Sequence, residues 1–183
     1  MLIEQSLLID YAEKYDSNQS LHEGIVKKAE QNEIKTAFLC HSHEDVRLVK
    51  GLSAMFRLKG IELYIDWADN SLPSTPNRLT ASKIQEKIDD SEYFFFLSTE
   101  NSMKSRWCPW EIGYADKSNS KILIIPTRDG RNNYGNEYLG LYSSLDGKVD
   151  VNILYSTYKL GIKNSNGWFP IWDQLSNSAL EKL

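Results

Sequence analysis

The sequence of 183 residues lacks the features that mark several broad classes of protein. It has two cysteines, Cys40 and Cys108, too few for a disulfide-stabilised fold, and we expect a protein of the reducing cytoplasm. The formal net charge is -4, so no excess of positive charge attracts nucleic acid. No apolar run approaches the roughly 20 residues that cross a bilayer, so no membrane partner is expected.

Common catalytic and nucleotide-binding motifs are also absent. There is no glycine-rich dinucleotide fingerprint, no P-loop, no H-E-x-x-H zinc motif and no G-x-S-x-G nucleophile motif. Cys40, His41, His43 and Cys108 are residue types that bind zinc, but their spacing matches no common site, and we expect no metal. Cys108 beside one of these histidines is a possible nucleophile, although cysteine is more often a small buried apolar residue.

The sequence does contain alternating short apolar runs and amphipathic segments. Continuous apolar runs indicate strands buried on both faces, as in a parallel sheet. The runs are Thr36–Cys40, Ile61–Ile65, Tyr93–Leu97 and Ile122–Ile125. Helical spacing of apolar residues predicts helices around Leu48–Phe56, Ile84–Ile88 and Trp107–Lys117. The alternation predicts an α/β domain, with a central parallel sheet of about five strands and helices on both faces.

The two ends of the sequence are less clearly patterned. Residues 1–33 have amphipathic helical spacing and predict an N-terminal helical extension. We expect this extension to pack on its own domain rather than on a second copy of the chain. Residues 34–183 are expected to form the main domain, of which residues 129–183 are divergent. There, Val149–Leu154 is predicted as the fifth strand, and Trp168–Leu175 as a last helix or a packed loop.

Polar residues follow the predicted strands, where ligands bind in open parallel sheets. The segments at these strand ends are His41–Asp45, Asp66–Trp67 and Ser98–Glu100. Trp107 and Glu111 are four residues apart, so they share one face of the predicted third helix. An aromatic ring beside a carboxylate suits a flat heterocycle or a sugar. The spacing alone also allows Trp107 to be a core anchor and Glu111 a solvated surface acid.

Four segments, in order, resemble the Toll/interleukin-1 receptor (TIR) domain family. They are Thr36–Asp45 (TAFLCHSHED), Gly60–Asp66 (GIELYID), Ser105–Ile112 (SRWCPWEI) and Lys121–Pro126 (KILIIP). Each segment alone is a weak signal, whereas the ordered set over residues 35–128 is specific. The resemblance implies a flavodoxin-like TIR fold.

The resemblance also implies an activity. Some TIR domains only assemble, and others cleave NAD+ at the nicotinamide–ribose bond with a glutamate that matches Glu111. This glutamate favours an NAD+ glycohydrolase or cyclase, with NAD+ as the substrate and no separate cofactor. Water as the acceptor gives ADP-ribose, and an acceptor within the substrate gives a cyclic form. Beside the catalytic Glu111, the residues expected to bind substrate are His41, Ser42, His43, Tyr64, Trp67 and Trp107.

The biological context follows from the same resemblance. As a small TIR protein of the freestanding type, the chain resembles bacterial antiphage proteins of the Thoeris type, in which the TIR protein makes a nucleotide signal for a separate effector. Self-association through TIR–TIR contacts is also implied, with the long Ala68–Thr80 connection placed against a neighbour. The alternatives are a non-catalytic interaction module (an adaptor or a host-mimicking effector), a deoxyribosyltransferase-like enzyme and a phosphoacceptor receiver domain. The receiver needs an acidic set that Glu44, Asp45 and Asp66 supply only in part.

Overall fold

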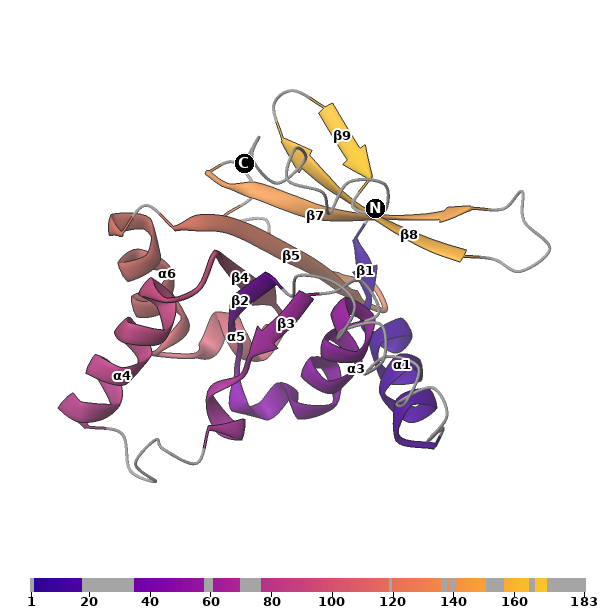
Figure 1. Cartoon of the computed structure of the whole chain (residues 1–183). Helices are drawn as coiled ribbons and strands as arrows, with labels where there is room; N and C mark the ends of the chain where they lie inside the picture. The colour runs from indigo at the N-terminus through magenta and orange to yellow at the C-terminus, as the bar shows by residue number, and fades with distance from the viewer. Residues whose placement is uncertain are drawn as a thin grey trace.

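The computed structural model describes residues 2–17, 35–57, 61–69, 77–118, 120–135, 138, 141–150, 157–164 and 167–170. Within these residues a nine-stranded sheet has the order β3-β2-β4-β5-β7-β8-β9, and β1 and β6 each pair with β5 (Figure 1). The strands are β1 (Ile3–Glu4), β2 (Lys35–Cys40), β3 (Ile61–Tyr64), β4 (Tyr93–Ser98), β5 (Lys121–Asp129), β6 (Asn132–Tyr134), β7 (Ser143–Asp150), β8 (Thr157–Asn164) and β9 (Gly167–Pro170).

The helices of the described residues connect and cover these strands. They are α1 (Gln5–Ser17), α3 (Val46–Arg57), α4 (Arg78–Asp89), α5 (Glu100–Lys104) and α6 (Cys108–Lys117), with short 3-10 turns η1 (His43–Asp45) and η2 (Asp66–Ala68). Helices α3, α4 and α6 confirm the three helices predicted from apolar spacing. The five-residue α5 was not predicted, because a helix of about one turn has no periodic pattern to recognise.

Strands β3, β2, β4, β5 and β7 run parallel to one another. Their order along the sheet, taken in chain order, is that of flavodoxin-like folds. The predicted fold class, a parallel sheet of five strands with surrounding helices, is therefore confirmed. In Figure 1, α1 and α3 lie side by side on one face of this sheet, and α4 and α6 lie on the other face.

Strand β4 shows why the sequence forms this sandwich. Every residue of Tyr93–Ser98 is buried, because helices cover both of its faces. Successive side chains of a strand point to opposite faces. Phe95 accordingly packs in the core under α1 and α3, whereas Phe94 and Phe96 pack in the core under α4 and α6. The continuous apolar run therefore supplies two hydrophobic cores at once.

The N-terminal segment is built into the domain. Residues 5–17 form the expected helix, but Ile3 and Glu4 form a strand that pairs with the end of β5, where the sequence analysis expected helix. Ile3 and Leu8 are fully buried. A Cβ on Gly51 of α3 would lie 1.8 Å from the carbonyl oxygen of Leu8, so α1 and α3 are in backbone contact. The predicted helical stretch after residue 17 lies outside the described residues.

For the C-terminal part, one prediction named a strand but misplaced its start, and a second was wrong. The fifth parallel strand is β7, which starts at Ser143, six residues before the predicted start at Val149. Trp168 lies in β9, paired with Lys163 of β8, and not in a helix or a packed loop. Strands β7, β8 and β9 form antiparallel ladders. The sequences of β7 and β8 alternate and lack a continuous apolar run, and β9 has only four residues. Residues 151–154 and 171–175 of these predictions lie outside the described part.

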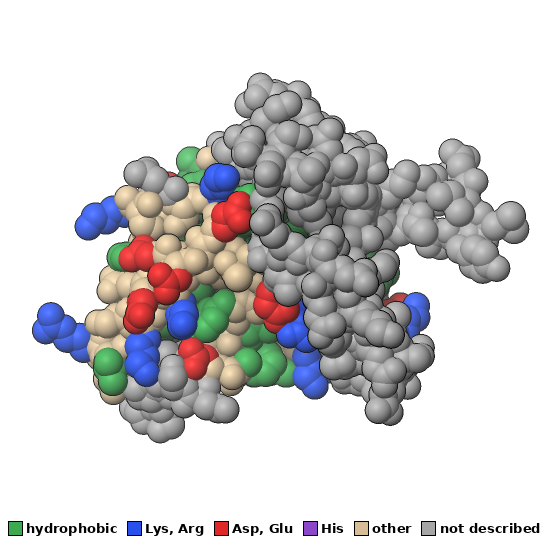
Figure 2. All heavy atoms as spheres, viewed as in Figure 1, with side chains coloured by type: hydrophobic (Ala, Val, Ile, Leu, Met, Phe, Trp, Pro, Cys, Tyr) green, Lys and Arg blue, Asp and Glu red, His purple; other side chains and the backbone are tan. Residues whose placement is uncertain are grey.

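The surface and the helices give two further observations. On the face drawn in Figure 2, the described residues present acidic and basic side chains interspersed with one another. Among the described residues, no helix is long and apolar enough to span a membrane.

Candidate active site

A pocket of about 430 Å³ opens where β2, β3 and β4 end. The chain leaves β2 toward α3 on one face of the sheet and leaves β4 toward α6 on the other. Such a divergence between neighbouring strands is where ligands bind in doubly wound folds. The pocket brings together five of the predicted site residues: His41, Ser42, His43, Trp107 and Glu111. The volume lies within the range of small-molecule sites.

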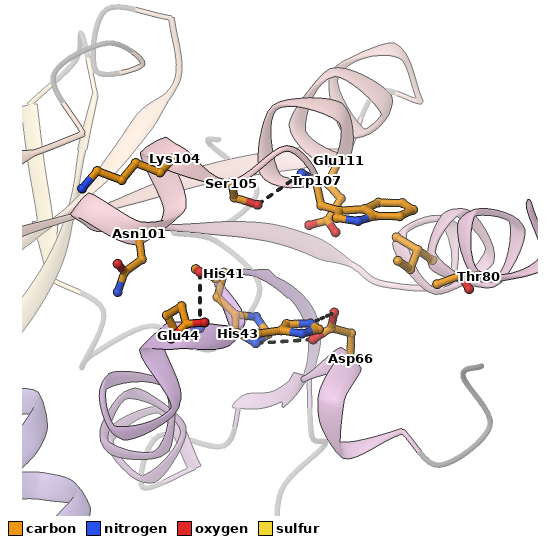
Figure 3. Close-up of a pocket in the computed structure, with 12 residues that line it drawn as sticks. His41, His43, Glu44, Asp66, Thr80, Asn101, Lys104, Ser105, Trp107 and Glu111 are labelled. Atoms are coloured by element: carbon orange, nitrogen blue, oxygen red, sulfur yellow. Dashed lines mark hydrogen bonds and ion pairs between the residues drawn. The ribbon is translucent and has the colours of Figure 1, made fainter. Parts of the chain in front are cut away.

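Glu111 lies in the first turn of α6 and lines the pocket, although it is only 5% exposed. Figure 3 shows its carboxyl group pointing from α6 across the pocket toward His43 and Asp66. Burial, with a smaller contribution from Cys108, raises the pKa of Glu111 to about 8. Burial therefore favours the protonated form of Glu111 at neutral pH, and a cation beside it would favour the carboxylate.

Trp107 precedes α6 and is half-buried beside this carboxyl group (Figure 3). Its ring packs edge-on against Trp110, with 5.4 Å between the ring centroids. The Ser105 hydroxyl accepts hydrogen bonds from the backbone N–H groups of Trp107 (3.2 Å) and Cys108 (3.3 Å). These bonds fix the start of α6, and with it the positions of Trp107 and Glu111.

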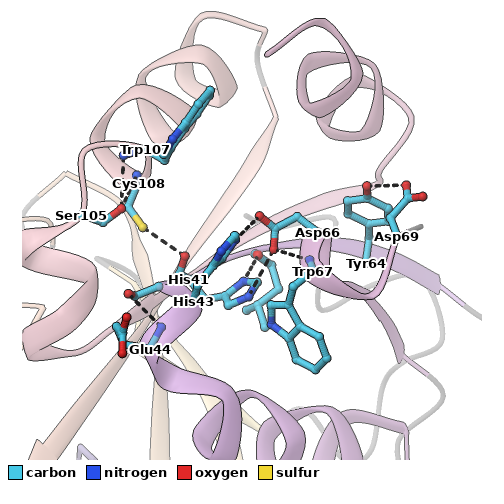
Figure 4. Close-up of polar contacts among 12 residues, drawn as sticks. His41, His43, Glu44, Tyr64, Asp66, Trp67, Asp69, Ser105, Trp107 and Cys108 are labelled. Atoms are coloured by element: carbon cyan, nitrogen blue, oxygen red, sulfur yellow. Dashed lines mark hydrogen bonds and ion pairs between the residues drawn. The ribbon is translucent and has the colours of Figure 1, made fainter. Parts of the chain in front are cut away.

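Opposite Glu111, two histidines surround the carboxylate of Asp66 (Figure 4). His43 Nε2 lies 2.8 Å from Asp66 Oδ2, and His41 Nε2 lies 3.4 Å from Asp66 Oδ1. The hydrogen bond to Asp66 raises the pKa of His43. Burial alone raises the pKa of Asp66, but the hydrogen bond from His43 and the charges of both histidines hold it below its ordinary value.

Beneath the pocket, two thiols connect β2 to α6. Cys108 Sγ donates to the His41 carbonyl oxygen at 3.4 Å, and Cys40 Sγ donates to the Cys108 carbonyl oxygen at 3.8 Å. Both cysteines are fully buried and neither is among the residues that line the pocket. Cys108 thus has a structural role here, and its position does not support the alternative of a thiol nucleophile. Across the described ranges, no group of three or more His, Cys, Asp or Glu side chains suits a metal ion.

Tyr64 and Trp67 are not among the described residues that line the pocket. Tyr64 stacks on Phe38, with 5.6 Å between ring centroids, and its hydroxyl donates to Asp69 Oδ2 at 2.7 Å. Trp67 is 39% exposed, and its ring lies edge-on to His41 at 6.4 Å. Their role in substrate binding stays a prediction, and for Tyr64 the contacts favour packing.

The pocket also contains residues that the sequence analysis did not assign to the site. They are Glu44, Asp66, Thr80, Ile84, Asn101, Lys104 and Ser105. Asp66 lies two residues after the end of β3, among the strand-end residues that the sequence analysis singled out. Asn101 and Lys104 lie on the unpredicted α5. Asn101 and Thr99 donate to the buried Asp45 at 2.7 and 2.5 Å, which ties the β4 end to the η1 turn.

The strand order and a buried glutamate at the divergence of β2 and β4 define the class of this protein: the chain belongs to the TIR domain family, whose model matches residues 37–151. It is similar to a Bacillus cereus protein described as a probable 3′ cyclic ADP-D-ribose synthase, ThsB′. The two are 35% identical over 130 residues, which cover 68% of this chain and 67% of that protein.

A second relative is described as a putative cyclic ADP-D-ribose synthase, TIR2, from Cytobacillus dafuensis. It is 24% identical over 113 residues, which cover 57% of this chain and 30% of that longer protein. The family membership expected from the four motif segments is therefore confirmed.

Proposed function

We propose that this chain is an NAD+ nucleosidase of the cyclase type, which releases nicotinamide from NAD+ and closes the remaining ADP-ribose into a cyclic product. The observation that carries the proposal is the Glu111 carboxyl group, 5% exposed and directed into the pocket. The names of both relatives describe cyclic ADP-D-ribose synthases, in agreement with this product class. NAD+ is the substrate, and the proposal needs no other cofactor.

The chemistry explains why one carboxylate suffices. Ordinary glycoside hydrolysis uses two carboxyl groups, because the leaving oxygen must be protonated. In NAD+ the leaving group is a pyridinium cation that departs as neutral nicotinamide, so no general acid is required. What remains is to stabilise the positive charge that develops on the ribose. A buried carboxylate held in place does this effectively, because little water competes with it.

Glu111 and Trp107 are arranged for that task. In the proposed complex the nicotinamide ribose lies against Glu111, with the pyridinium ring beside the Trp107 indole. The positive pyridinium favours the ionised form of Glu111, so substrate binding lowers a pKa that burial holds at about 8. His41, Ser42 and His43 would line the opposite wall of the occupied pocket.

The partners are part of the same proposal. A cyclic nucleotide product would act on a separate effector, as in the antiphage TIR proteins that this chain resembles. We further propose that copies of the chain associate through TIR–TIR contacts in the cytoplasm, with neither nucleic acid nor membrane involved.

The test is nicotinamide release from NAD+ by the full chain, followed by chromatography with mass spectrometry. Glu111→Ala should lower release at least about a hundredfold, the effect of losing roughly 3–4 kcal/mol of electrostatic stabilisation. Glu62→Gln is a matched control, because Glu62 pairs with Arg57 and does not line the pocket. Equal release by the wild type and Glu111→Ala would refute the catalytic role. A wild type that releases no nicotinamide would leave the interaction module as the better interpretation.

A further inference from the structure

The pocket contains an aspartate–histidine pair, Asp66 and His43, that is not needed to stabilise the ribose cation. Asp66 is held in place on two sides: its Oδ1 accepts the backbone N–H of Trp67 at 2.7 Å, and its Oδ2 is 2.8 Å from His43 Nε2. The carboxylate therefore holds the proton of a neutral His43 on Nε2, which leaves the lone pair on Nδ1. Within the described residues, the hydrogen bond to Asp66 is the one found for the His43 side chain.

His41 cannot serve in the same way, although it contacts the same carboxylate. Its side chain is only 1% exposed, and its Nδ1 is 2.8 Å from the Leu39 carbonyl oxygen. Its Nε2 is buried without a hydrogen-bond partner and faces Asp66 Oδ1 at 3.4 Å. Burial lowers the pKa of His41, whereas the hydrogen bond to Asp66 raises that of His43, so His41 is the weaker base of the two. The His43 side chain is 68% exposed and lines the pocket, where a substrate can reach it.

Ring closure by a hydroxyl group needs a proton acceptor. A hydroxyl oxygen of the substrate forms a bond to the ribose carbon that carried nicotinamide. The carbon–nitrogen bond breaks, and its electron pair leaves on the nicotinamide nitrogen. The hydroxyl proton must then be taken up, and Glu111 is already committed to the ribose cation. Water that attacks the same carbon can pass its proton to solvent at the pocket mouth. Hydrolysis therefore depends less on a protein base than ring closure does.

We propose that His43 Nδ1 accepts the proton of the substrate hydroxyl that closes the ring, and that Asp66 positions His43 for this step. The inference rests on the proposed function and adds a second catalytic residue to it. It also commits the reaction to an oxygen-linked cyclic product. The groups that face His43 are Asp66 after β3, Glu111 on α6, Glu44 on its own turn and His41.

The experiment measures three quantities from NAD+ with the full chain: nicotinamide, cyclic product and ADP-ribose. In His43→Gln the formation of cyclic product should fall about a hundredfold, the usual contribution of a general base. Nicotinamide release should fall less than about tenfold, and ADP-ribose should become the main product. Imidazole added to His43→Ala should restore part of the cyclic product, a result that a purely structural role would not give. Because His43 is mostly exposed, both variants are expected to fold, which thermal denaturation checks.

Asp66→Asn tests the positioning residue. It should lower the cyclic fraction and move the acidic limb of ring closure to lower pH, because His43 loses the carboxylate that raises its pKa. Glu62→Gln is again the control, since Glu62 pairs with Arg57 and is not among the residues that line the pocket. An unchanged cyclic fraction and rate in His43→Gln would overturn the inference while leaving NAD+ cleavage intact. Failure of the wild type to release nicotinamide would overturn both proposals.

Discussion

Burial of Glu111 predicts that the protein loses stability as pH rises, and that Glu111→Gln removes this loss. In the unfolded chain the carboxyl group ionises near its ordinary pKa of 4.5, whereas in the folded chain it keeps its proton up to about pH 8. Between these values the folded state binds more protons than the unfolded state. The free energy of unfolding therefore falls with increasing pH over this range, and levels off above it.

The magnitude follows from the two pKa values. A shift from 4.5 to about 8 corresponds to about 5 kcal/mol, lost at up to about 1.4 kcal/mol per pH unit. Glutamine keeps the shape and a hydrogen-bond donor but has no charge to bury. The variant should therefore gain on the wild type steadily between pH 5 and pH 8. In a domain of this size, the full difference corresponds to about 10–20 °C in Tm.

The assay is urea denaturation of both proteins at a series of pH values, and the quantity of interest is the difference in unfolding free energy. The difference cancels the contributions of all other titrating groups, provided that these are unchanged in the variant. A difference that stays constant from pH 5 to pH 9 would refute the reasoning, because it would mean that Glu111 is as well solvated in the folded protein as in the unfolded chain.

Two further predictions concern pH and packing. For nicotinamide release, kcat/KM should rise with pH up to about 8, because the carboxylate of Glu111 is the active form. The rise of kcat with pH should be complete at a lower pH, since bound pyridinium favours that carboxylate. A kcat/KM that is flat from pH 6 to pH 9 would contradict this. Gly51→Ala should cost about 3 kcal/mol or more in thermal denaturation, because its Cβ would lie 1.8 Å from the Leu8 carbonyl oxygen. Gly113→Ala is the control on α6: no neighbour among the described residues lies within 4 Å of its Cβ, and alanine should stabilise that helix by about 1 kcal/mol. Equal stability of the two variants would contradict the close helix contact.

The parallel core could be predicted from the sequence because burial on both faces leaves a direct mark. The run Tyr93–Leu97 has no polar alternation, and the structure buries all of it. The antiparallel strands at the C-terminal end leave no such mark. Strand β7 begins with Ser143 and Ser144, so a search for apolar runs starts it too late.

The site could be predicted only in part, for a related reason. Glu111 and Trp107 are close in the chain, and helical spacing places them on one face. The pairing of His43 with Asp66 joins residues 23 positions apart, and it depends on the register between β2 and β3. Spacing along the chain contains no information on that register, so Asp66 was identified as a strand-end residue and not as the partner of a histidine.

The two thiols beneath the pocket give the protein a reporter of its own. They are the two cysteines of the sequence, and both are fully buried where the end of β2 meets the start of α6. The rate at which an alkylating agent reacts with these thiols therefore reports how often the junction opens, and no cysteine has to be introduced. Burial raises the pKa of Cys40, whereas the hydrogen bond with Cys40 lowers that of Cys108, so Cys108 should react first. A ligand that bridges Glu111 and His43 would slow the reaction, and the labelling rate would thus measure occupancy without following catalysis.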